Sequence, residues 1–260
     1  MSETTPARPP RHRGIYLLPN LFTTGAMFAG FYAIISGIGG HFTEAAVAVF
    51  LAAILDGMDG RVARMTGTQT EFGVQYDSLS DLVSFGLAPA LVMYTWSLST
   101  LRDIGPLWGK LGWACAFIYA ACAALRLARF NTQAGVADKR YFQGLASPAA
   151  AAVNMSFVWT MEKASWSGSE LCLASAAIVL VTGLLMVSRF RYFSFKSLPM
   201  GERGNVPFAW MVVVVLLLAL LCLAPAQVLL AGFTLYLLSG PTWTIWARLA
   251  HRRRGRRQTA

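Results

Sequence analysis

DGMDGRVARMTGTQTEFGVQYDSLSD, residues 56–81, joins two apolar runs that extend over residues 43–64 and 74–98. Each run has the length of about 20 residues that a helix needs to cross a bilayer. Between Gly60 and Gly73 the chain contains the turn-forming segment Thr66-Gly67-Thr68, which can reverse its direction. The stretch therefore predicts two antiparallel membrane helices with a polar connection between them.

The composition of the whole chain agrees with a membrane protein. Of its 260 residues, 56% are hydrophobic and only 13% are charged, and the mean hydropathy is +0.52. A soluble domain carries about 25% charged residues, and disordered chains are poorer in large apolar residues. A single water-soluble globule, a disordered chain and a collagen-like repeat are therefore excluded.

Apolar runs of spanning length recur along the chain, with no sign of a second domain. We expect an all-α fold, a polytopic membrane helix bundle of about eight transmembrane helices, in one domain over residues 1–260. A basic tail precedes the bundle at residues 1–14, and an Arg-rich tail follows it at residues 248–260. The eight helices are expected at residues 20–39, 43–64, 74–98, 107–130, 145–162, 170–188, 206–223 and 226–247.

The distribution of basic residues predicts the orientation. The chain has 22 Lys and Arg against 12 Asp and Glu, a net charge of +10. With a cytoplasmic N-terminus, every Lys and Arg except Arg102, Lys110 and Lys163 lies on the cytoplasmic side, as the positive-inside rule demands. We expect both termini in the cytoplasm and the cytoplasmic membrane of a prokaryote as the location. The Arg-rich tail adjoins a helix end, so its expected partners are anionic membrane lipids, not nucleic acid.

Four aspartates stand out because they lie in or beside apolar helices. Asp56 and Asp59 are three residues apart, and Asp77 and Asp81 are four apart, so each pair lies on one helix face. Inserting an Asp at the centre of a membrane helix costs roughly 2.5–3.5 kcal/mol. These carboxylates must therefore be neutralised by a partner, lie near the membrane interface, or both. Two antiparallel helices can aim all four at one point, where oxygen ligands suit a divalent cation, Mg²⁺, Mn²⁺ or Ca²⁺.

Two other interpretations compete with a catalytic metal site. The aspartates could be ordinary solvated charges at the interface, or they could form the site of a cation-coupled transporter. Neither interpretation explains why all four gather at one cytoplasmic edge beside Gly60, Ala63, Arg64 and Gly73.

The spacing D-x2-D-G-x2-A-R-x8-G-x3-D-x3-D over residues 56–81 resembles the motif of the CDP-alcohol phosphatidyltransferases. The segment Pro19-Asn20-Leu21-Phe22-Thr23 is similar to the start of the first helix in that family. The resemblance implies a metal site formed by Asp56, Asp59, Asp77 and Asp81, with Asp81 also the general base that accepts the proton of the attacking hydroxyl. It further implies that the nucleotide of a CDP-lipid is bound by Gly60, Ala63, Arg64 and Gly73.

Later segments resemble the branch of the family that uses serine as the acceptor alcohol. These segments are LRLARFN at 125–131, FQGLASP at 142–148, MVS at 186–188 and YFSFK at 192–196. Ala146 departs from the proline expected in the second segment. The resemblance implies CDP-diacylglycerol and L-serine as substrates, phosphatidylserine and CMP as products, and a homodimer. Glycerol 3-phosphate or an inositol-type acceptor remains the alternative.

The acceptor would need cationic partners on the cytoplasmic side, because serine carries a carboxylate and the donor carries phosphates. Arginine binds both groups bidentately. The candidate residues for serine or phosphate are Arg126, Arg129, Arg189 and Arg191. Charge alone does not decide among the acceptors, since glycerol phosphate would also want cations.

Overall fold

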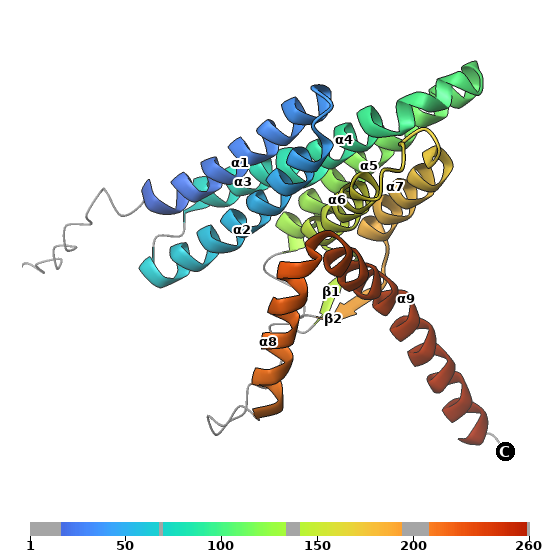
Figure 1. Ribbon diagram of the computed structural model, residues 1–260. Coiled ribbons are helices and arrows are strands. Elements are labelled where there is room, and N and C mark those ends of the chain that lie inside the picture. Colours follow the sequence, from blue (N-terminus) through green and yellow to red (C-terminus); the bar gives the residue numbers. More distant parts are fainter. Residues whose placement is uncertain (1–16, 68–69, 134–140, 194–207, 259–260) are drawn as a thin grey trace, which may run out of the picture.

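The computed structural model describes residues 17–67, 70–133, 141–193 and 208–258, and the tail expected at residues 1–14 lies outside them. As expected, the architecture is all-α, apart from one short two-stranded ribbon (Figure 1). The α-helices are α1 (Leu17–Ile38), α2 (Phe42–Thr66), α3 (Glu71–Asp81), α4 (Ala88–Trp96), α5 (Pro106–Gln133), α6 (Ser147–Lys163), α7 (Cys172–Val187), α8 (Phe208–Leu223) and α9 (Pro225–Gln258). The remaining elements are a π-helix η1 (Leu82–Leu87), a 3₁₀-helix η2 (Leu98–Asp103) and the strands β1 (Tyr141–Gln143) and β2 (Arg191–Phe193).

Two elements differ from the eight expected helices. The helix expected at 74–98 is divided into α3, η1 and α4, because the π-helix interrupts the α-helical hydrogen bonding shortly before Pro89. The last helix does not end near residue 247. It continues to Gln258, so most of the Arg-rich segment expected as a tail is helical.

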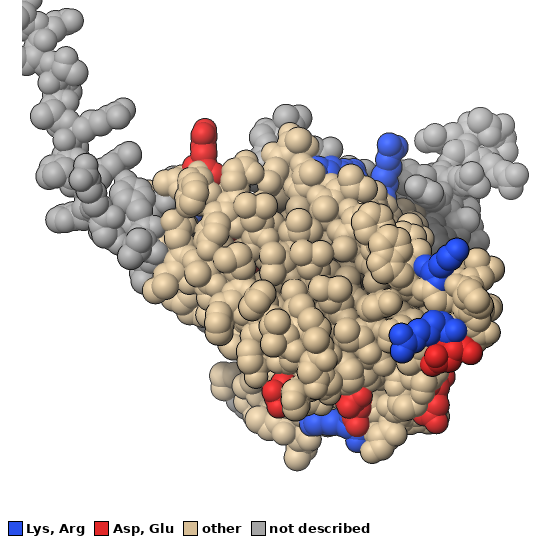
Figure 2. Space-filling model, turned by 90° about the horizontal axis from the view of Figure 1, so that it is seen from above, with Lys and Arg blue, Asp and Glu red and all other residues tan. Residues whose placement is uncertain are grey.

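Three helical stretches among the described residues are long and apolar enough to cross a membrane: Pro19–Ile38, Glu71–Trp96 and Pro106–Thr132. Cys172–Val187 and Trp210–Leu223 are apolar but shorter. Figure 2 shows a broad uncharged face with the charged side chains at its rim. Such an apolar surface marks contact with lipid or with another apolar partner. The fold is therefore that of a helical integral membrane protein.

Small residues allow the helices of the bundle to approach closely. Ala26, Ala29 and Ala33 of α1 are buried, and α2, which packs along α1, buries mainly alanines. Small residues at such interfaces bring the backbones of membrane helices together. α6 is the central helix, since every residue from Ala149 to Val158 is buried. In contrast, α8 is exposed along most of its length, and α8 and α9 diverge from the bundle (Figure 1).

The ribbon connects the segment before the start of α6 with the segment after the end of α7. β1 and β2 are antiparallel, with Phe142 opposite Tyr192. Gly144 follows β1 at φ +82°, and a Cβ there would lie 2.3 Å from the Met186 carbonyl oxygen. Only glycine fits this left-handed, close approach. Tyr192 is buried, and its hydroxyl donates to the Leu237 carbonyl at 3.2 Å, which ties β2 to α9.

Candidate active site

Three of the four aspartates meet between the second half of α2 and the second half of α3. Each of Asp56, Asp59 and Asp77 offers a carboxylate oxygen, and these three oxygens lie within 4.8 Å of one another. The local sequence explains how. Gly67, at φ +62°, ends α2, and the Thr70 hydroxyl caps α3 by accepting a hydrogen bond from the Gly73 N–H at 3.0 Å. α2 and α3 therefore run in opposite directions, both pack against α1, and their aspartates meet (Figure 1).

The chemistry of these residues fits a divalent cation. Three carboxylates in one place repel one another unless a positive charge lies between them. One oxygen of Asp77, Oδ1, is buried and has no hydrogen-bond partner in the described part of the structure. A buried carboxylate oxygen needs a ligand or a donor. A cluster of oxygen donors without His or Cys favours Mg²⁺, Mn²⁺ or Ca²⁺ over zinc.

Asp81 lies one helical turn further along α3 and does not belong to this group of three. Its carboxyl is close enough to those of Asp56 and Asp77 and to the guanidinium of Arg126 for electrostatic interaction, although Asp81 and Arg126 form no direct ion pair among the described residues. Arg126 comes from α5, is half-buried, and donates a hydrogen bond to the hydroxyl of Ser147 at the start of α6. Asp81 thus has a cationic neighbour in addition to the other aspartates.

Thr23 of α1 supports the cluster from a third helix. The Thr23 side chain is buried, and its hydroxyl donates to Oδ2 of Asp59 at 2.6 Å. The Ser80 hydroxyl of α3 donates to the Thr23 carbonyl at 3.0 Å. Sequence reasoning noticed Thr23 only within the segment that resembles the family's first helix and missed this contact. The signal available in the sequence was a hydroxyl-bearing residue within an apolar helix.

The four residues expected to bind the nucleotide surround the same helical hairpin. Gly60 faces open space, with no atom within 4 Å of a Cβ built on it. A Cβ on Gly73 would lie 3.1 Å from the Thr70 hydroxyl that caps α3, so this position is already tight. Ala63 is half-buried and Arg64 is exposed in the last turn of α2. The hairpin therefore has an open wall next to the carboxylates and an exposed cation at its rim.

The four candidate arginines do not form one group. Arg126 interacts electrostatically with Asp81, as described above. Arg129, one turn further along α5, donates to the Val187 carbonyl at the end of α7 at 3.4 Å. Arg189 is exposed, and Arg191 belongs to β2, but its side chain lies outside the described part of the structure. Of these, Arg126 lies within electrostatic range of a carboxylate, that of Asp81.

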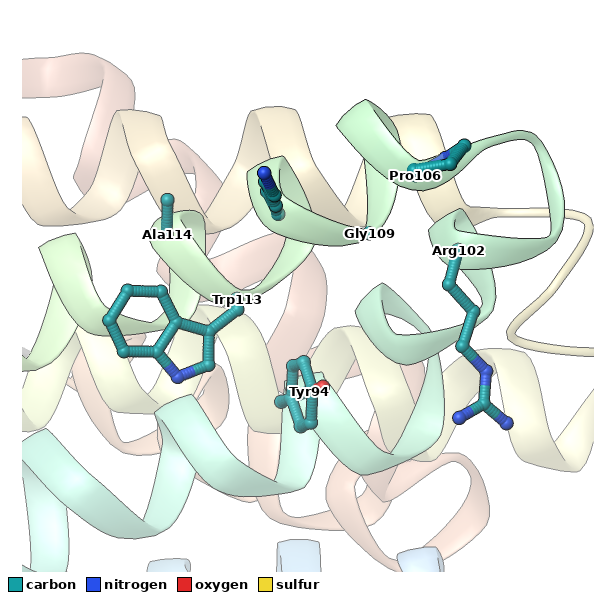
Figure 3. Close-up of a pocket in the computed structure, with 7 residues that line it drawn as sticks. Tyr94, Arg102, Pro106, Gly109, Trp113 and Ala114 are labelled. Carbon is teal, nitrogen blue, oxygen red and sulfur yellow. The ribbon is translucent and has the colours of Figure 1, made fainter.

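A hollow lies at the end of the bundle opposite the aspartates. It is formed near η2 and the start of α5, where Figure 3 shows Tyr94, Arg102, Pro106 and Trp113. The membrane-length helix from Glu71 to Trp96 separates it from the aspartates. It contains two cations, Arg102 and Lys110, and no carboxylate of the described residues lines it, so it offers nothing to the metal cluster.

Comparison with known proteins agrees with this geometry. Residues 16–187, which include all four aspartates, match the family model described as CDP-alcohol phosphatidyltransferase. The chain is 34% identical over 226 residues to the CDP-diacylglycerol–serine O-phosphatidyltransferase of Helicobacter pylori, with 87% of this chain and 90% of that protein covered.

Two further relatives come from a mycobacterium and an archaeon. A Mycobacterium tuberculosis protein of the same name is 37% identical over 195 residues, which cover 69% of this chain and 64% of that protein. The archaetidylserine synthase of Methanothermobacter thermautotrophicus is 35% identical over 177 residues, which cover 67% and 69% of the two chains. The names of all three relatives refer to serine.

Proposed function

Because the chain belongs to the CDP-alcohol phosphatidyltransferase family, we propose that it transfers the phosphatidyl group of CDP-diacylglycerol to the hydroxyl of L-serine. The products are phosphatidylserine and CMP. The observation that carries this proposal is the similarity, over 87% of the chain, to an enzyme named for that reaction. The cluster of aspartates inside the matched range supports it.

The chemistry divides naturally over the four carboxylates. A divalent cation, Mg²⁺ or Mn²⁺, with Ca²⁺ as a third possibility, would be held by Asp56, Asp59 and Asp77 and would offset the charge of the pyrophosphate. Asp81 accepts the proton of the serine hydroxyl as its oxygen bonds to the phosphorus next to the diacylglycerol. The bond between that phosphorus and the oxygen of CMP breaks, and CMP leaves.

The surrounding residues position the two substrates. Gly60, Ala63 and Gly73 leave room for the nucleotide to approach the backbone, and Arg64 pairs with its phosphate. Arg126 binds the carboxylate of serine, because it is a half-buried cation beside the proposed base. Serine held at Arg126 brings its hydroxyl toward Asp81. Arg129, Arg189 and Arg191 supply further positive charge on the same side of the membrane.

The arrangement in the membrane forms part of the proposal. We place eight crossings in a single domain, with both termini and the active site on the cytoplasmic side of a prokaryotic cytoplasmic membrane. The Arg-rich end of α9 then meets anionic lipid headgroups. By resemblance to the family, the enzyme acts as a homodimer.

The experiment that tests the function is an acceptor panel. Purified enzyme receives CDP-diacylglycerol, Mn²⁺ and one acceptor at a time: serine, glycerol 3-phosphate, inositol or inositol phosphate. Lipid products are identified by mass, and CMP is measured separately. We expect a lipid product that contains serine, together with a stoichiometric amount of CMP. The Asp77→Asn variant should form neither the lipid product nor CMP. A product with glycerol phosphate or inositol, and none with serine, would reassign the acceptor but retain the chemistry.

A further inference from the structure

The membrane-length helix from Glu71 to Trp96 changes its hydrogen bonding directly after Asp81. It is continuous from Glu71 to Trp96, but η1 replaces the α-helix from Leu82 to Leu87, and the Ala88 N–H donates to the Val83 carbonyl, five residues back. Pro89 follows and has no N–H. The Phe85 carbonyl, four residues before Pro89, therefore cannot receive the hydrogen bond that an α-helix would give it.

A neighbouring helix supplies the missing donor. Tyr119 of α5 is fully buried, and its hydroxyl donates to the Phe85 carbonyl at 3.1 Å. Inside a membrane no water can satisfy a freed carbonyl, so a Pro in a spanning helix depends on its neighbours and on π-helical adjustments. Both a neighbouring donor, Tyr119, and a π-helical segment, η1, are present here. Tyr119 is therefore the partner that matches the break caused by Pro89.

The same hydrogen bond fixes the position of two active-site residues. Phe85 lies four residues after Asp81 on one helix. Arg126 lies seven residues after Tyr119 on the other, two turns along the same face of α5. The Arg126 guanidinium lies within electrostatic range of the Asp81 carboxyl, without a direct ion pair between them among the described residues. A bond from Tyr119 to Phe85 consequently sets how far α5 and α3 slide past each other, and so keeps Arg126 opposite Asp81.

Close packing on both sides limits any other arrangement. A Cβ on Gly86 of η1 would lie 3.2 Å from the Cβ of Ala123 on α5. A Cβ on Gly183 of α7 would lie 3.2 Å from the Cα of Tyr119. Tyr119 is thus held between η1 and α7, with its hydroxyl directed at the carbonyl that Pro89 leaves free.

We propose that Tyr119 is a positioning residue for the transfer reaction: its hydroxyl holds the π-helical segment after Asp81 and thereby the alignment of Asp81 with Arg126. This inference rests on the proposed function, because it concerns the base and the serine-binding cation of that reaction. Tyr119 itself touches no substrate.

The first test is Tyr119→Phe, which removes one hydroxyl and keeps the ring. Displacements on the order of 1 Å at a reacting centre cost up to roughly a hundredfold in rate. We expect kcat per folded enzyme to fall by about tenfold to a hundredfold, while KM for CDP-diacylglycerol stays within about twofold because its proposed site lies on α2 and the start of α3. A merely structural role would lower the yield and melting temperature but not this kcat. Tyr94→Phe, on α4 beside the far hollow, is the matched control and should behave as wild type.

The decisive test adds Pro89→Ala, which restores an N–H at position 89 that can pair with the Phe85 carbonyl. Tyr119→Phe should then have little further effect on kcat or on melting temperature. The double-mutant cycle measures this coupling directly. If Tyr119→Phe alone fails to fold, recovery of folded enzyme in the double variant supports the same bond.

The outcomes separate this inference from the proposed function. A wild-type enzyme that makes no lipid product from any acceptor would reject the transfer reaction, and the melting-temperature cycle would still test the bond. An active wild type whose Tyr119→Phe variant keeps its kcat would reject the positioning role alone. Equal losses on Tyr119→Phe in the wild-type background and in the Pro89→Ala background would also reject it.

Discussion

At the scale of single residues, the four aspartates differ in their surroundings more than in their spacing. Asp56, Asp59 and Asp77 share a small space in which Asp77 Oδ1 lacks a donor among the described residues. Asp81 interacts electrostatically with Asp56 and Asp77 but also with Arg126. Asp81 therefore has a cation of the protein as a neighbour, whereas the other three share a place for a metal ion. This asymmetry favours metal binding by the first three residues and proton transfer by the fourth.

The first prediction separates these roles by substitution. Asp81→Asn should lower kcat by about 10²–10⁴, the usual contribution of a general base, with metal affinity nearly retained. Asp56→Asn and Asp77→Asn should lose metal binding and turnover together. Calorimetric titration with Mn²⁺ and initial rates with serine give both quantities. Asp103→Asn, an exposed surface substitution beside Arg102, is the control. If Asp81→Asn abolished metal binding, Asp81 would be a principal ligand and the base would lie elsewhere.

The second prediction concerns Thr23, whose hydroxyl holds Asp59 from α1. Thr23→Val keeps the shape of the side chain and removes the donor. Residues that orient metal ligands typically contribute 10–100-fold in metal affinity or activity, so we expect a loss of about tenfold or more in Mn²⁺ affinity. Thr95→Val is matched, because the Thr95 hydroxyl bonds only to carbonyls of its own helix in the described structure. Unchanged affinity in Thr23→Val would show that Asp59 needs no support from α1.

At the scale of helices, apolar periods and turn residues predicted most of the fold. The helical hairpin around residues 56–81 was predicted from two local features of the sequence. These are the turn-forming segment between Gly60 and Gly73 and the spacing of the aspartates. The π-helix was not predicted, because it depends on where Tyr119 of another helix meets the carbonyl freed by Pro89. The contact of Thr23 with Asp59 is equally non-local. Sequence patterns locate helices well, but contacts between helices follow from packing.

The third prediction tests packing between α1 and the membrane-length helix from Glu71 to Trp96. A Cβ on Gly30 would lie 2.6 Å from Ser84 Oγ and 2.7 Å from Ser84 Cα, and Ser84 donates to the Ala26 carbonyl of α1 at 3.0 Å. Gly30→Ala must push the helices apart. Overpacking of this kind costs about 1–3 kcal/mol, so the melting temperature in detergent should fall clearly. Gly232→Ala, with no atom within 4 Å of the added Cβ, should not lower it. Equal melting temperatures for the two variants would contradict this interface.

At the scale of the whole molecule, the order of crossings stays a prediction from the distribution of the charges. Only Arg102, Lys110 and Lys163 lie on the side opposite the aspartates if every expected helix crosses the membrane. The broad face in Figure 2 carries its charges at the rim, as expected of a surface that contacts lipid. The orientation therefore depends on whether the shorter helices also cross.

The last prediction tests that point through α8. Between Arg102 and residue 257 the described parts of the chain form the five α-helices α5 to α9, and an odd number of crossings puts these two positions on opposite sides. α8 has 16 residues, which span about 24 Å at 1.5 Å per residue, less than the hydrocarbon thickness of about 30 Å. It can still cross where the bilayer thins or flanking residues reach the interface, at a small cost per ångström. Its apolar, exposed side chains favour crossing over a position in water. Reporter fusions after Arg102 and after Lys163 should both show the external side, and a fusion after Arg257 the cytoplasmic side. An external signal after Arg257 would mean that one helix of the C-terminal half does not cross the membrane. α8, the short helix, would be the first candidate for a helix that does not cross.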